Sequence, residues 1–158
     1  MISMILQLAT RFRIAIENAC ENDEFNKYYP FNKFPYDCCD MTCELLAEFF
    51  HEHNIHTILV NGKHIDCQTW HHIWLQTDNN IVIDITCDQF NGENGFSDNF
   101  PKVHVGNKLQ VHDKFSFQIN NEERMFFNDN STFSGFQGIS NKREKDLQIM
   151  YKIIKKYL

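Results

Sequence analysis

The spacing of apolar residues changes along this chain, and the change limits the folds open to it. Over residues 2–20 apolar side chains recur every three or four positions, which predicts an amphipathic helix. The same period returns at 39–53 and at 140–158, where Ser140 is the expected cap. Between these segments lie short β-type runs, the clearest at 56–60, 72–77 and 81–86, with weaker ones from 102 to 119. The order of helices, antiparallel strands and a final helix predicts an α+β fold.

Length and composition indicate one packed domain. A chain of 158 residues is long enough for a single hydrophobic core, so we expect one domain over residues 1–158. Hydrophobic residues make up 42% of the chain and aromatic residues 14%, which is typical of a globular protein. The net charge of -6 argues against nucleic-acid binding, because affinity for phosphates requires clustered Lys and Arg.

The N-terminal segment carries no signal for export. It lacks a basic start and a small-residue cleavage site, and Arg11 and Arg13 interrupt its apolar run. No segment approaches the roughly 20 apolar residues that span a bilayer. We therefore expect a cytoplasmic protein without a membrane span, with secretion by a route that needs no cleaved signal peptide left open. In the cytoplasm the six cysteines are expected to be free thiols.

Three cysteines crowd the start of the helix at 39–53, in the stretch "FPYDCCDMTC". Asp37 is the expected N-cap, which places Cys38 and Cys39 at the helix start. The unpaired N–H groups of a helix N-terminus favour a thiolate, so this is a suitable place for a nucleophile. Cys43 lies one turn further on and is expected to pack in the core. Small buried residues at a helix start remain the alternative explanation for Cys38 and Cys39.

The stretch "TWHHIWLQTDNNIVIDIT" predicts a β-hairpin that brings a histidine to a carboxylate. With a three-residue loop at 78–80, Trp74 pairs with Asp84, and His72 becomes a diagonal neighbour of Asp84 on one face. A carboxylate in that position would fix the tautomer of the imidazole and stabilise its protonated form. A two-residue turn would instead place the two side chains on opposite faces. His71 points to the other face in either case.

Three motifs together resemble the papain-like and transglutaminase-like cysteine hydrolase superfamily: "FPYDCC" entering a helix, "HIWL" on a strand and "IDITCDQF" on the next. The likeness is greatest to small bacterial proteins with FPxxxC, HxWL and IDITxDQF motifs, and it covers residues 34–90. The resemblance implies a nucleophile helix packed on an antiparallel sheet, with flanking N- and C-terminal helices. It also implies Cys39 as nucleophile, His72 as base and Asp84 as the orienting acid.

The function implied by this resemblance is a cysteine hydrolase or acyl transferase that cuts an amide or peptide bond through a thioester, as a peptidase, amidase or deamidase. A protein or peptide, with a glutamine side chain as one option, is the expected substrate, and no cofactor is expected. Gln89 and Trp74 are the expected substrate contacts, although Trp74 also suits a core position. Asp40 departs from the pattern, because a carboxylate beside a thiol raises the thiol pKa. A catalytically inactive binding protein is therefore the alternative.

A metal site is the rival chemistry. Five residues could supply zinc ligands: His51, His53, His56, Cys67 and His71. Their spacing is poor, since residues two apart on a helix do not share a face and no paired CxxC or HExxH motif is present. We therefore predict no metal site.

Overall fold

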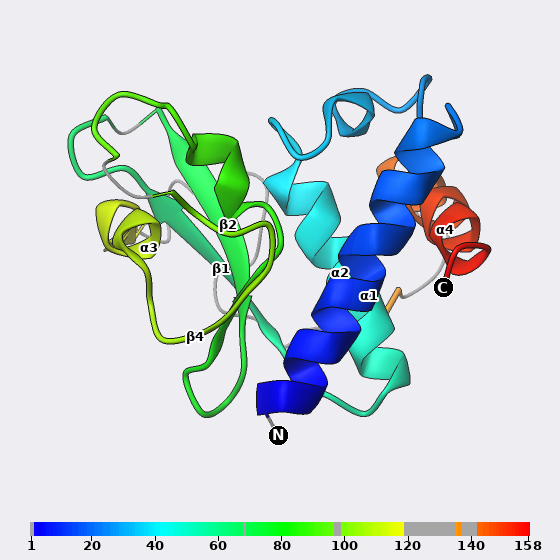
Figure 1. The fold of residues 1–158 in the computed structure, drawn as a ribbon, viewed down its shortest axis with the longest axis horizontal. Coiled ribbons are helices and arrows are strands. Elements are labelled where there is room, and N and C mark those ends of the chain that lie inside the picture. The colour runs from blue at the N-terminus through cyan, green and yellow to red at the C-terminus, as the bar shows by residue number, and fades with distance from the viewer. Residues whose placement is uncertain (1, 68, 97–98, 119–134, 137–141) are drawn as a thin grey trace.

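The computed structural model describes residues 2–67, 69–96, 99–118, 135–136 and 142–158 (Figure 1). The α-helices are α1 (Ile2–Glu21), α2 (Cys39–Glu52), α3 (Gln110–Lys114) and α4 (Lys142–Lys155), and the 3-10 helices are η1 (Phe31–Lys33) and η2 (Cys87–Phe90). The strands are β1 (Ile58–Lys63), β2 (His71–Gln76), β3 (Val82–Asp84), β4 (His104–Gly106) and β5 (Phe117–Gln118). The strands form one sheet in the order β4-β3-β2-β1-β5 with antiparallel pairing throughout, so the α+β prediction is confirmed.

The sheet separates two groups of buried side chains. Helices α1, α2 and α4 lie on one side of the sheet and α3 lies on the other (Figure 1). Ile73, Leu75 and Ile83 of the sheet belong to the larger group, which contains the helices. Trp74 and Val82, which alternate with them, belong to a second group that is rich in aromatic side chains. Neighbouring residues of one strand therefore reach different cores, as the two-residue period of a strand requires.

Helices α1 and α2 begin and end close to the predicted positions, but the cap of α2 differs. Cys38 is the N-cap in place of Asp37, and its side chain makes no capping hydrogen bond to a backbone N–H of the helix. Asp37 has φ of 57°, in the left-handed region, and so lies one residue outside the helix. Helix α4 also follows the prediction, with its apolar stripe buried. The expected cap Ser140 lies outside the described residues.

Two sequence expectations for the strands are wrong. The Asn61-Gly62 pair is a sequence signal that predicts a turn, yet β1 continues through both residues. A Cβ on Gly62 would lie 1.8 Å from the backbone oxygen of Phe115, so glycine is required here by close packing of two backbones. The run from 108 to 118, expected as a strand, instead forms α3 followed by the short β5. Val111 and His112, which α3 buries, account for the apolar signal there.

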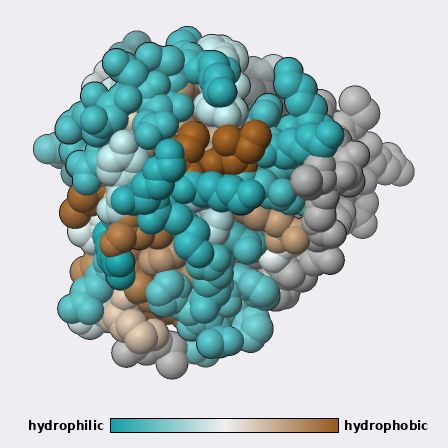
Figure 2. Space-filling model, turned by 90° about the vertical axis from the view of Figure 1, so that its right-hand side faces the viewer, coloured by the Kyte–Doolittle hydropathy of each residue, from teal (hydrophilic) through white to brown (hydrophobic). Residues whose placement is uncertain are grey.

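The surface carries its large apolar side chains mostly as separate residues. Figure 2 shows one face of the molecule as predominantly hydrophilic, with apolar patches between the polar groups. Several of the exposed apolar residues, such as Met4, Leu6 and Ile14, are on α1. Scattered apolar residues of this kind are normal on a protein surface. Among the described residues, no helix is both long enough and apolar enough to cross a membrane.

Candidate active site

The hairpin of β2 and β3 has the register expected for a three-residue loop. Leu75 pairs with Ile83 and Gln76 pairs with Val82. Within the loop, Asn80 has φ of 61°, which gives the left-handed residue that follows the turn in such hairpins. This register places His72 and Asp84 on the same face of the sheet. The Nε2 atom of His72 lies 2.7 Å from Oδ2 of Asp84, and both side chains are buried.

Asp84 has a hydrogen-bond partner for every lone pair of its carboxylate. Oδ1 accepts from the backbone N–H of Thr86 at 2.8 Å and from its hydroxyl at 3.1 Å. Oδ2 contacts His72 and also Nε2 of His112, at 3.1 Å. Burial acts to raise the pKa of Asp84, but the hydrogen bonds of the two histidines, and their charge when they are protonated, outweigh it and hold that pKa well below 3.8. Asp84 is therefore an ionised acceptor at neutral pH.

His112 was not expected at this site. It comes from α3, within the run that the sequence led us to interpret as a strand, and its ring is fully buried. The backbone N–H of Leu109 donates to Nδ1 of His112 at 2.9 Å, so Nδ1 carries a lone pair and the ring proton is on Nε2. Burial lowers the pKa of His112, against the opposite effect of Asp84, and this favours the neutral ring. A histidine directly after Val111 in "LQVHDKF", a run with apolar residues at its start and end, was the available signal.

His72 has one ring nitrogen satisfied and one free. Because ionised Asp84 can only accept, the Nε2 atom of His72 donates and Nδ1 holds the lone pair. Among the residues that the structure describes, none forms a hydrogen bond with the buried Nδ1 atom, and His72 itself is 0% exposed. The ring packs edge-on against Phe90, with centroids 4.9 Å apart, and near Trp74 and Phe115. An unpaired buried acceptor costs about 1–3 kcal/mol, so this nitrogen is a candidate functional atom.

Cys39 is the first residue of α2 and is half-buried. Burial raises the pKa of its thiol, the charge of Asp40 raises it further, and a hydrogen bond with the Ile73 backbone lowers it. Ile73 follows His72 in β2, so the thiol lies beside the strand that carries the histidine. The side chain of Cys39 packs against the helical core, however, and no hydrogen bond described in the structure joins Cys39 to His72.

The other two cysteines of this helix are core residues. Cys38 is fully buried, and its sulfur accepts from the hydroxyl of Thr42 at 3.6 Å. Burial raises the pKa of Cys38 to about 12. Cys43 donates to the backbone oxygen of Ile73 at 3.3 Å and is 4% exposed, as expected for a packing residue. All six cysteines are free, which confirms the expectation of thiols.

The charge of Asp40 is partly offset by a residue distant in sequence. Arg143 of α4 lies 3.0 Å from Oδ2 of Asp40 and 3.2 Å from Oε1 of Glu44. This pairing lessens the effect that Asp40 would otherwise have on Cys39. Because the Arg143 side chain is 42% exposed, solvent and salt weaken the pairing.

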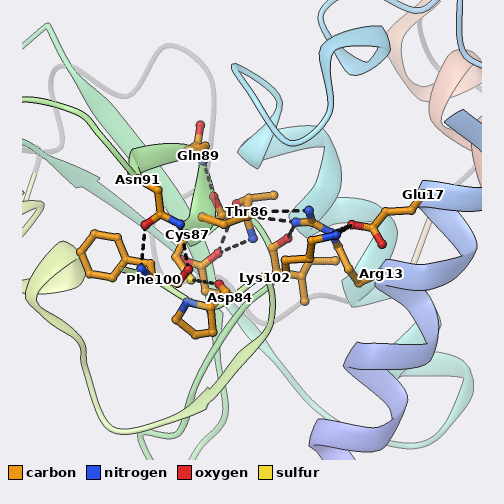
Figure 3. Close-up of polar contacts among 12 residues, drawn as sticks. Arg13, Glu17, Asp84, Thr86, Cys87, Gln89, Asn91, Phe100 and Lys102 are labelled. Atoms are coloured by element: carbon orange, nitrogen blue, oxygen red, sulfur yellow. Dashed lines mark hydrogen bonds and ion pairs between the residues drawn. The ribbon is translucent and has the colours of Figure 1, made fainter. Parts of the chain in front are cut away.

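The segment after Asp84 is tied to α1 by a buried arginine, as Figure 3 shows. Arg13 is a charged residue within the helix predicted at 2–20, yet it is only 3% exposed. Its guanidinium donates to both carboxylate oxygens of Asp88, at 3.0 and 2.9 Å, and to the backbone oxygen of Ile85. It also lies 4.4 Å from the ring of Phe34, in the segment that enters α2. Arg13 thus contacts both the segment that precedes Cys39, through Phe34, and the segment that follows Asp84, through Ile85 and Asp88.

Of the two expected substrate contacts, Trp74 is buried and Gln89 is half-buried. Trp74 is 1% exposed and lies in the second core, so it has no surface that a substrate could reach in this structure. Gln89 donates from Nε2 to the backbone oxygen of Thr86 at 2.9 Å, and Figure 3 shows it above the Asp84 segment. His71 is exposed, on the face opposite to His72, as expected.

One group of side chains at this site has the donor atoms of a metal centre. Within the described part of the chain, His72, Asp84 and His112 are the group of possible ligands that lie close together, with their atoms within 4.8 Å of one another. The histidines and the cysteine of the sequence hypothesis do not form such a group there. Because Nδ1 of His112 accepts a hydrogen bond, Nε2 carries the proton and has no lone pair for a metal ion. The group suits a hydrogen-bonded relay better than a metal.

Comparison with known proteins adds no relative. No family model matches this sequence, and neither curated proteins nor solved structures yield a match. The chemistry of the site therefore rests on its own geometry.

Proposed function

We propose that the protein is a cysteine-dependent hydrolase or acyl transferase that acts on an amide or peptide bond, with a fold of the papain-like and transglutaminase-like kind. The observation that carries the proposal is the buried contact of His72 with Asp84. Because Nε2 of His72 is bonded to Asp84, the lone pair of Nδ1 can act as a base. His72 lies on β2, the strand whose Ile73 backbone contacts Cys39. A base oriented in this way by a carboxylate is the arrangement that thiol and hydroxyl nucleophiles use.

The reaction begins with transfer of the thiol proton of Cys39 to Nδ1 of His72. The sulfur forms a bond to the carbonyl carbon, and the C–N bond breaks as His72 returns the proton to the leaving nitrogen. The product of this half is a thioester on Cys39. Water, or an amine in a transferase, then attacks the thioester carbon and gives up a proton to His72. The C–S bond breaks, and His72 passes that proton to the leaving sulfur, which restores the thiol.

The raised thiol pKa favours a neutral Cys39 at rest. His72 would therefore act on the thiol as a general base during attack, instead of holding a preformed thiolate. Catalytic hydrogen bonds are often long in the absence of substrate and shorten in the complex. In this structure the Cys39 side chain packs with the helical core and the His72 ring packs with the aromatic group, so the proposal assigns their contact to the state in which a substrate, or an amide reagent such as iodoacetamide, occupies the site. The N–H groups at the start of α2 are the available donors for an oxyanion.

Alkylation by iodoacetamide near neutral pH tests this assignment. Cys67 is exposed and hydrogen bonds with Thr69 lower its pKa, so the measurement uses a Cys67→Ser protein. Peptide mapping then follows the rate at Cys39. We expect His72→Gln to slow alkylation of Cys39 about tenfold, because general-base assistance is lost. The matched control is His71→Gln, on the exposed face of the same strand, which should leave the rate unchanged.

A second measurement tests the reaction itself. The protein is incubated with a mixture of short peptides, and mass spectrometry detects cleavage, deamidation or transfer. Products that disappear in Cys39→Ala and persist in Cys43→Ala support the proposal. Equal rates of alkylation with and without His72, together with products that survive in Cys39→Ala, would overturn it.

A catalytically inactive binding protein is the second candidate. It is favoured by two observations, the raised thiol pKa of Cys39 and the complete burial of His72. For such a protein, His72→Gln would alter stability but leave the alkylation rate of Cys39 unchanged, and the peptide mixture would yield no product.

A further inference from the structure

Two histidines share one oxygen of Asp84, although a hydrolase of the proposed kind requires only one. Nε2 of His72 and Nε2 of His112 lie 2.7 and 3.1 Å from the same Oδ2 atom. The second histidine comes from α3, a separate element from the hairpin that supplies the first pair. All three side chains are fully or almost fully buried, so water cannot substitute for a missing partner.

His112 fills the remaining acceptor site of the Asp84 carboxylate. A carboxylate has about four acceptor sites. Thr86 occupies the two on Oδ1, and the two imidazoles occupy those on Oδ2. With every site filled, Asp84 cannot rotate or accept a proton without breaking one of these bonds. The shorter bond goes to His72, so Asp84 remains chiefly its partner.

The tautomer of His112 is set by the hydrogen bond at Nδ1, the ring nitrogen that does not contact Asp84. The N–H of Leu109 lies 2.9 Å from Nδ1, which leaves Nε2 as the donor to Asp84. The ring is therefore oriented by a backbone group of its own helix start and can rotate only by losing both bonds. The charged and titratable groups that face it are Asp84, His72 and His104, whose ring centroid lies 5.8 Å away.

We propose that His112 is a positioning residue, a neutral imidazole that holds Oδ2 of Asp84 towards His72 and so determines that Nδ1 of His72 carries the lone pair. This inference rests on the proposed function for its catalytic meaning. The hydrogen bonds of His112 go to Leu109 and Asp84, and its ring centroid lies 6.2 Å from that of His72, so the role assigned to it is to hold Asp84 and not to act on a substrate.

Two variants of His112 separate a positioning role from a merely structural one. His112→Gln keeps an N–H that can donate to Asp84, whereas His112→Phe keeps a flat ring without a donor. We expect His112→Phe to reduce the alkylation rate of Cys39 severalfold and to shift the midpoint of its pH profile. His112→Gln should restore most of the rate. His104→Gln, which removes a neighbouring imidazole but no bond to Asp84, is the control and should match the parent Cys67→Ser protein.

Nitrogen NMR of the parent protein supplies a readout that needs no variant and no activity. We expect Nδ1 of His112 to be unprotonated and Nε2 of both histidines to be protonated at neutral pH. A protonated Nδ1 on His112, or a pH profile that is the same in His112→Phe and the parent, would overturn the inference. If the NMR assignment holds but Cys39 alkylation does not depend on His72, the proposed function fails while the placement of His112 stands.

Discussion

Arg13 and Asp88 form a two-pronged ion pair between α1 and η2, with both guanidinium–carboxylate distances at or below 3.0 Å. Only 4% of the Arg13 side chain and 13% of the Asp88 side chain are exposed. Removing one partner of a buried pair leaves an uncompensated charge, which costs about 3–5 kcal/mol. We expect Arg13→Met to lower the free energy of unfolding by about 3 kcal/mol, measured by urea denaturation.

The control for this variant is Arg11→Met, on the same helix. Arg11 is exposed and bonds to the terminal residue Leu158, so its replacement should cost less than about 1 kcal/mol. Equal losses in the two variants would show that the Arg13 pair does not stabilise the junction of α1 and η2. Because Arg13 also contacts Phe34, alkylation of Cys39 should change in Arg13→Met but not in Arg11→Met.

Gly62→Ala should be strongly destabilising. Its new Cβ would meet the backbone oxygen of Phe115 at 1.8 Å, and a backbone atom cannot rotate away as a side chain can. We expect a loss of about 2–4 kcal/mol in urea denaturation, in the range seen for overpacked sites. At Gly106, the nearest atom to a new Cβ is at 3.5 Å, so Gly106→Ala should be nearly neutral. A small effect at Gly62 would mean that β1 and α3 are further apart than described.

Stability should fall as the pH falls. The folded-state pKa values of Asp84 and His112 are both held below their ordinary values of 3.8 and 6.5. The unfolded chain therefore binds more protons than the folded one, first at His112 below about pH 6.5 and then at Asp84 below about pH 4. Each proton contributes a slope of up to about 1.4 kcal/mol per pH unit. Urea denaturation between about pH 7 and pH 4 measures this loss.

The variant His112→Gln tests whether His112 causes the loss of stability that begins below about pH 6.5. Without the imidazole, the loss of stability between about pH 6.5 and pH 4 should become shallower. In His104→Gln, which leaves the bonds of Asp84 intact, the slope should stay as in the unmodified protein. A stability that is independent of pH in this range would contradict a buried neutral His112.

Arg143 should affect the reactivity of Cys39 through Asp40. Without the guanidinium, the charge of Asp40 acts on the thiol unopposed and raises its pKa. Since the pair is partly exposed, Arg143→Gln should slow alkylation of Cys39 only about two- to fivefold. The difference should shrink in concentrated salt, which screens the charge of Asp40. Lys142→Gln, an exposed change at the neighbouring position, should have no such effect.

The sequence alone determined the elements whose signals are local. The apolar period at 2–20 and 39–53 predicted two helices, because one face of each is buried continuously. For the hairpin, the sequence left two registers open, and the structure has the one with a three-residue loop at 78–80. This register brings His72 to Asp84, since alternation along two strands fixes which side chains share a face.

Tertiary structure decided the rest. That Asn61 and Gly62 form a strand, not a turn, depends on the backbone of Phe115, more than fifty positions away. The buried place of Arg13 depends on Asp88, and the place of His112 depends on Asp84. A helical or β-type period shows which face is buried but not which distant polar group will meet it there. The partners of buried polar residues are therefore fixed only when the elements pack together.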